Sequence, residues 1–70
     1  MFEYTKIREL REDNDKSQQD IAKLLNITQP QYHLYESGKR EIPFHLLIIL
    51  ADYYNVSLDW IAGRSDRKHT

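Results

Sequence analysis

Apolar side chains recur every three or four residues along most of this chain, which is the spacing of amphipathic helices. Short polar stretches interrupt the pattern, and several contain an asparagine or a glycine, residue types that suit the end of a helix. The pattern therefore predicts an all-α domain of five short helices. They are expected at about residues 3–13, 17–25, 29–36, 43–54 and 56–63.

The stretch from Ser17 to Gly38 carries the clearest local signals. Ser17 is a favourable N-cap residue, and Asp20 stands three residues later, as a capping box requires. Thr28 and Gln31 repeat this arrangement at the start of the next helix, and Gly38 is a natural stop for that helix. Two capped helices joined by a tight turn form the helix-turn-helix pattern.

The turn and the buried faces follow from the same spacing. Asn26 can adopt the left-handed conformation that ends a helix, and Ala22 is small enough for the two helices to cross closely. The residues expected to face the core of the first three helices are Ile7, Leu10, Ile21, Ala22, Leu25, Tyr32 and Tyr35.

The fourth helix is the most apolar element and is expected to form the back of the core. The residues that make it so apolar are Phe44, Leu47, Ile48, Leu50 and Ala51. The helix is apolar around more of its circumference than one face needs. Either Phe44 or the pair Ile48–Ile49 is therefore also a candidate contact for a partner.

Composition limits the class of protein. Hydrophobic residues are 40% of the chain and charged residues 30%, which fits a soluble folded domain, and there is no cysteine. The longest apolar run, 46–51, is too short to span a bilayer, and the N-terminus lacks a signal-peptide pattern, which favours a cytoplasmic protein. The net charge of −1 argues against a general binder of polyanions, so any DNA contact requires a local basic patch.

Much of the chain, from about Ile7 to Gly63, resembles the Cro/C1-type helix-turn-helix family of phage and bacterial repressors. The matching positions are Ser17, Gln18, Ile21, Ala22, Ile27, Thr28, Gln29, Tyr32, Tyr35, Glu36, Gly38, Lys39, Arg40 and Pro43. The resemblance implies a compact five-helix, lambda-repressor-like domain at 1–63, with the helix-turn-helix at about 17–37. Residues 64–70 form a polar tail that is expected to fray.

The resemblance also implies a function and its site. It implies sequence-specific binding to double-stranded DNA by a transcriptional repressor or autorepressor, which acts as a homodimer on a palindromic operator and needs no cofactor. Helix 29–36 would enter the major groove, where a glutamine can pair with adenine and a leucine can contact a thymine methyl group. The candidate base-reading residues are Gln29, Gln31, His33 and Leu34, and the candidate phosphate contacts are Gln18, Lys39, Arg40 and Lys16.

Other positions receive structural roles. The resemblance implies that Arg11 pairs with Glu36, and the planar guanidinium suits a two-pronged contact with a carboxylate. The remaining charged residues of the first helix, namely Lys6, Arg8, Glu9 and Glu12, are expected on its solvated side. Candidate dimer contacts are Leu58, Trp60 and Phe44.

Two other functions stay open. The chain could be an antitoxin, which would bind DNA and a protein partner, or a protein-interaction module that retains the fold with weak or no DNA binding. An enzyme is not expected, because His33, His45 and His69 lack metal-ligand spacing and a chain with two glycines has no glycine-rich phosphate loop.

Overall fold

The computed structural model describes residues 5–68, which form an all-α domain as the sequence predicts. Its helices are α1 (Thr5–Asp13), α2 (Gln18–Leu25), α3 (Gln29–Glu36), α4 (Phe44–Tyr54) and α5 (Leu58–Ile61). The predicted start of α1 near residue 3, and the histidine at position 69, lie outside the described residues. Within 5–68, no helix is both long enough and apolar enough to cross a membrane.

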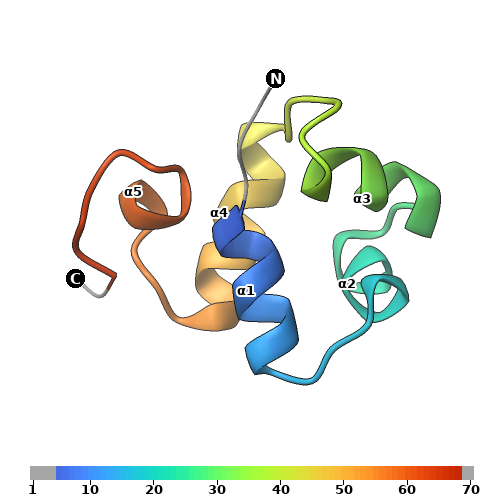
Figure 1. Ribbon diagram of the computed structural model, residues 1–70, viewed down its shortest axis with the longest axis horizontal. Helices are drawn as coiled ribbons and strands as arrows, with labels where there is room; N and C mark the ends of the chain where they lie inside the picture. The colour runs from blue at the N-terminus through green and yellow to red at the C-terminus, as the bar shows by residue number, and fades with distance from the viewer. Residues whose placement is uncertain (1–4, 69–70) are drawn as a thin grey trace.

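The helices divide into two packed groups around α1 and α4. Helices α2 and α3 pack against each other, α3 also contacts α1, and α5 packs on α4. Figure 1 shows α2 and α3 on one side of the molecule and α5 on the opposite side. The outward side of α2 and α3, here called the helix-turn-helix face, is therefore remote from α5.

Both predicted N-caps of the helix-turn-helix are present. The Ser17 hydroxyl accepts from the Asp20 backbone N–H at 3.0 Å, and the Asp20 carboxylate accepts from the Ser17 N–H at 3.0 Å, which completes the capping box. Thr28 accepts from the Gln31 N–H at 3.2 Å. The return bond, in which the Gln31 side-chain oxygen would accept from the Thr28 N–H, is not formed. The Gln31 amide nitrogen donates to the Tyr35 hydroxyl at 3.3 Å.

The core follows the predicted helical spacing in α1, α2 and α3. Tyr32 is 0% exposed and Tyr35 is 3% exposed, so both tyrosines of α3 face inward. The apolar residues predicted inside α1 and α2 are also buried. Helix α3 therefore presents the rest of its circumference, including His33 and Leu34, away from the core.

The sequence left open which apolar residues of α4 stay outside the core. Its inward residues are Leu46, Leu47, Leu50 and Ala51. Phe44 is 61% exposed, and Ile48 and Ile49 are 39% and 37% exposed, so both of the alternative partner contacts lie on the surface. Successive residues turn by about 100° around a helix, which places Ile48 and Ile49 on the solvent side and Phe44 at the boundary of the buried side. The reason is that a helix apolar on most sides can bury only the side its neighbours cover.

The start of α1 and the tail are more closely packed than predicted. The Lys6 ammonium donates to the Trp60 carbonyl at 3.0 Å and lies 4.8 Å from the centre of the indole ring, so it is not simply solvated. The Lys68 ammonium lies 5.3 Å from the same ring, and the Lys68 carbonyl accepts from the Ser57 N–H. The tail therefore folds back on α5 as far as Lys68, and the prediction that it frays is wrong there.

Asn26 provides a test of the turn between α2 and α3. Its φ of 59° is left-handed, and its backbone N–H caps the end of α2. We expect Asn26→Ala to lower the free energy of unfolding by about 1 kcal/mol, because a Cβ without a compensating local hydrogen bond is strained there. Asn26→Gly should be as stable as the wild type or more so. Urea denaturation measures both, and equal stability of the alanine and glycine variants would contradict this account.

Candidate functional site

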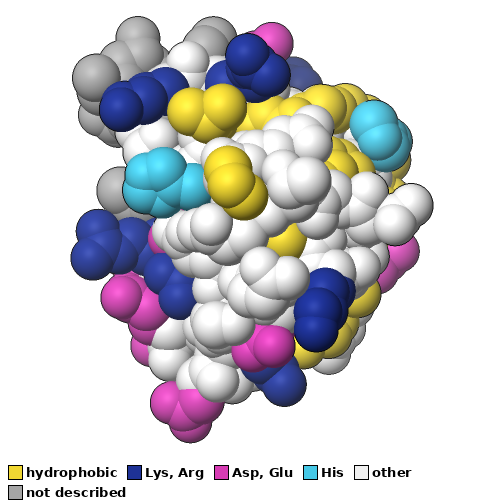
Figure 2. Space-filling view, turned by 90° about the vertical axis from the view of Figure 1, so that its right-hand side faces the viewer, with side chains coloured by type: hydrophobic (Ala, Val, Ile, Leu, Met, Phe, Trp, Pro, Cys, Tyr) yellow, Lys and Arg dark blue, Asp and Glu magenta, His cyan; other side chains and the backbone are white. Residues whose placement is uncertain are grey.

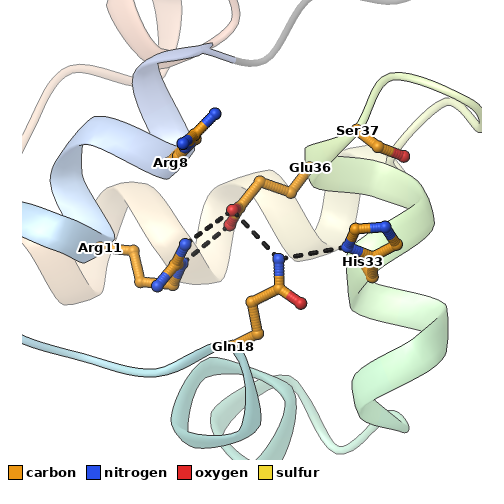
Figure 3. Close-up of a pocket in the computed structure, with 6 residues that line it drawn as sticks. All are labelled: Arg8, Arg11, Gln18, His33, Glu36 and Ser37. Carbon is orange, nitrogen blue, oxygen red and sulfur yellow. Dashed lines mark hydrogen bonds and ion pairs between the residues drawn. The ribbon is translucent and has the colours of Figure 1, made fainter.

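The centre of the helix-turn-helix is an ion pair between α1 and the end of α3. Arg11 Nε donates to Glu36 Oε2 at 2.9 Å, and Arg11 Nη2 donates to Glu36 Oε1 at 2.8 Å. This is the pair that the resemblance implies, and Figure 3 shows the two side chains extended toward each other. The Arg11 side chain is only 14% exposed and that of Glu36 only 5%. Two parallel bonds fix orientation as well as distance.

Gln18, the first residue of α2, joins the same carboxylate. Its amide nitrogen donates to Glu36 Oε1 at 3.2 Å and lies 3.3 Å from His33 Nδ1 (Figure 3). Its amide oxygen accepts from Gln29 Nε2 at 2.6 Å. One side chain of α2 thus contacts the first residue of α3, a middle residue and the last residue, which braces the helix along its length.

The electrostatics of this cluster keep the pair charged. Burial alone would raise the pKa of Glu36, but Arg11, then the Tyr32 hydroxyl and Gln18, together outweigh burial, so that the pKa is lowered. The hydrogen bond to Glu36 raises the pKa of Arg11 in turn. The remaining prong of the guanidinium, Nη1, donates to the Lys16 carbonyl at 2.9 Å, which ties the loop before α2 to the pair.

The structure brings most of the candidate base-reading residues together. A shallow depression on the helix-turn-helix face is lined by Gln18, Gln29, Pro30, His33 and Leu34. His33 is exposed, and Gln29 and Leu34 are partly exposed. Gln31 is partly exposed but lies outside this depression, where its amide is bonded to the Tyr35 hydroxyl.

The candidate phosphate contacts have different settings. Lys16, Lys39 and Arg40 are exposed, whereas Gln18 is partly buried in the network described above. The backbone N–H groups of Lys39 and Arg40 both donate to the Leu34 carbonyl, which holds the loop against the end of α3. Figure 2 shows this face largely uncharged at its centre, with Lys and Arg side chains, and also Asp and Glu side chains, toward its margins.

The sequence missed two residues of the site. Arg8 and Ser37 line a second depression with Arg11, Gln18, His33 and Glu36 (Figure 3). Arg8 was expected on the solvated side of α1, and it does remain exposed. Its Nε lies 3.6 Å from Glu12 Oε2. Its spacing of three residues before Arg11 was the available signal, because residues three apart share one side of a helix.

Comparison with known proteins connects this geometry to a described family. A helix-turn-helix family model matches residues 7–61 of the chain. Three similar proteins of Bacillus subtilis (strain 168) are named as HTH-type transcriptional regulators: AnsR, and YobD and YqaE, which are described as uncharacterized. No solved structure was found to match the chain.

The similarity to these relatives covers most of the chain. AnsR is 37% identical over 65 residues, which are 93% of this chain and 56% of AnsR. YqaE is 36% identical over 63 residues, 89% of this chain and 54% of YqaE. YobD is 33% identical over 61 residues, 87% of this chain and 54% of YobD. The chain therefore spans about half the length of each relative.

The ion pair yields a prediction about stability. We expect Glu36→Gln to lower the free energy of unfolding by about 2–3 kcal/mol, because Arg11 then keeps its charge in a mostly buried site without a counter-charge. The double variant Arg11→Gln/Glu36→Gln should cost less than the sum of the two single changes. Additive costs in urea denaturation would show that the two side chains do not depend on each other.

The same variant has a defined pH dependence. Because folding lowers the pKa of Glu36, its charge stabilises the folded state above the pKa of an unfolded glutamate, about 4.3. That stabilisation is lost as the pH falls below this value. The stability gap between wild type and Glu36→Gln should therefore be full at pH 7 and narrow in acid, and a constant gap would rule out the charge as its cause.

Proposed function

The chain belongs to the Cro/C1-type helix-turn-helix family, and from that membership we propose that it binds double-stranded DNA in a sequence-specific manner and regulates transcription. The observation that carries the proposal is the bracing of α3. Gln18 contacts both ends of this helix, and Glu36 anchors its last turn to Arg11 on α1. A helix held in this way presents one fixed outer side to a ligand.

Helix α3 has the size and the side chains for the major groove. Eight residues extend about 12 Å, comparable to the width of that groove. We assign base reading to Gln29, Gln31, His33 and Leu34. Gln29 lies at the N-terminal end of α3, where recognition helices meet the base edges, and Leu34 offers apolar contact for a thymine methyl group.

Phosphate contact is assigned to Gln18, Lys16, Lys39 and Arg40. Phosphate contacts position a protein on the duplex without specifying sequence, which suits residues around the margins of the reading surface. The net charge of −1 is compatible with this role because the cations of the helix-turn-helix face are gathered at its edges (Figure 2).

We further propose that the protein is a repressor or autorepressor that acts as a homodimer on a palindromic operator. The two recognition helices of such a dimer would enter major grooves one helical turn, about 34 Å, apart. A regulator of this kind works in the cytoplasm and joins the nucleoid when bound to DNA. The family model describes a helix-turn-helix, and AnsR is named as a transcriptional regulator. Both names support a binding function rather than catalysis.

An antitoxin or a protein-interaction module on the same fold is the second candidate. The observation that favours it is the apolar surface left exposed on α4, which a protein partner could cover. An antitoxin would retain the DNA contacts assigned above. A module without DNA binding would not, so that DNA titration separates the two.

The phosphate assignment can be tested without knowing the operator. Binding to a mixed-sequence duplex is titrated at several salt concentrations. We expect Lys39→Ala and Arg40→Ala each to weaken binding and to reduce the slope of log K against log salt by about 1, because each change removes one phosphate contact.

Two control variants make the test specific. Arg67→Ala removes the same charge from the tail beside α5, on the opposite side of the molecule, and should leave the slope unchanged. Gln29→Ala should change the slope little, since a base contact releases no counterion. Equal slopes for Lys39→Ala, Arg40→Ala and Arg67→Ala would contradict the placement of DNA on the helix-turn-helix face.

A further inference from the structure

The exposed apolar residues of this domain are concentrated on one helix. Among the described residues, the exposed large hydrophobic side chains are Leu24 on α2 at 38% and four on α4. Those of α4 are Phe44 at 61%, Tyr53 at 44%, Ile48 at 39% and Ile49 at 37%. An apolar surface gathered in this way on a small domain usually marks a contact with another molecule.

The outer side of α4 also has an internal symmetry. In chain order its exposed residues are Phe44, His45, Ile48, Ile49, Asp52 and Tyr53. The order is symmetric about the midpoint between Ile48 and Ile49. Phe44 and Tyr53 are the aromatic residues at the two ends, and the polar residues His45 and Asp52 are the next residues inward. These two polar residues are complementary, because an imidazole N–H can donate to a carboxylate.

We propose that this side of α4 binds the same side of a second copy of the chain, with the two helices antiparallel. A two-fold axis that passes between Ile48 and Ile49 places His45 of each copy opposite Asp52 of the other. These two residues are seven apart, so they share one side of the helix. The contact is self-complementary, as an isologous interface must be, and it makes each polar pairing twice.

The isoleucines of both copies form the apolar centre of the interface around the axis. Phe44 and Tyr53 are nine residues apart, about half a turn around the helix, so they flank this centre on opposite edges. The rows 44-48-52 and 45-49-53 follow the spacing of four residues that forms packing ridges on a helix surface. A domain of 70 residues buries a small core, so that covering this surface also adds stability.

The α4 surface replaces two of the dimer contacts expected from the sequence. Leu58 and Trp60 pack against the core of their own chain, and the ammonium groups of Lys6 and Lys68 both already lie over the Trp60 ring. Phe44, the third expected contact, is the most exposed of the large apolar residues described. The expectation of a dimer is kept, and its location moves to α4.

The arrangement suits the proposed function, which it deepens by naming the partner. Helix α4 lies behind α1 in Figure 1, and the rear of that view becomes the right-hand side of Figure 2. Hydrophobic side chains gather there along the edge of the helix-turn-helix face. An axis along that edge directs both helix-turn-helix faces the same way, as a palindromic site requires. The contact itself does not depend on DNA.

The first experiment is sedimentation equilibrium of the full chain without DNA. We expect a dimer of twice the 8.4 kDa chain mass. Ile48→Arg should weaken it by at least about a hundredfold, because the charge enters the centre of the interface twice. Leu24→Arg is the matched control, since Leu24 is equally exposed but lies on α2. A monomeric wild type, or equal effects of the two variants, would overturn the proposal.

Charge exchange tests the antiparallel pairing and excludes misfolding as the cause. His45→Asp places two carboxylates together at both ends of the interface and should weaken the dimer about tenfold. The same change puts an acid in the first turn of α4, which has none, so that the helix itself is favoured. The double variant His45→Asp/Asp52→His should restore dimerisation, and a double variant as weak as the single one would overturn the pairing.

The two proposals fail separately. A monomeric wild type that still binds DNA with the salt dependence described above would overturn the α4 dimer, and with it the homodimer in solution, and leave the DNA proposal standing. A dimer that is lost in Ile48→Arg but shows no salt-dependent binding to DNA would overturn the DNA proposal and leave the α4 contact standing.

Discussion

The ion pair between Arg11 and Glu36 links the first three helices of this domain. It joins α1 to the last turn of α3, and Gln18 extends it to α2 and to the start of α3. Removing two charges from water is costly, and a buried pair recovers that cost only with good geometry and further hydrogen bonds. Here the guanidinium also donates to the Lys16 carbonyl, and the carboxylate accepts from Gln18 as well as from Arg11.

An apolar contact at this position would hold α3 less specifically. Hydrophobic side chains tolerate sliding, whereas two parallel hydrogen bonds define both a distance and an angle. For a helix that reads bases, an error in angle moves each side chain along the groove. The Arg11–Glu36 pair also helps to keep the centre of the helix-turn-helix face uncharged. Arg11 neutralises the charge of Glu36 beneath the surface, so that this charge does not face the phosphates.

Local signals in the sequence predicted the helices, the Ser17 cap and the left-handed Asn26, since each depends on neighbours within one turn. Spacing also predicted the buried tyrosines of α3. It left open which side of α4 is buried, because α4 is apolar on most sides and only its packing partners decide this. The pairing of Arg11 with Glu36 came from the resemblance alone. The bond from Gln31 to Tyr35 depends on the observed rotamers and had no signal in the sequence.

The central claim is that a braced α3 reads DNA sequence, and selection from a pool of random duplexes tests it most directly. The wild type and Gln29→Ala are each carried through selection at moderate salt, and the bound duplexes are sequenced. The account predicts an enriched palindrome for the wild type with half-sites one helical turn apart, and the same spacing with altered bases for Gln29→Ala. Enrichment of identical sequences by both proteins, or no enrichment by the wild type, would contradict it.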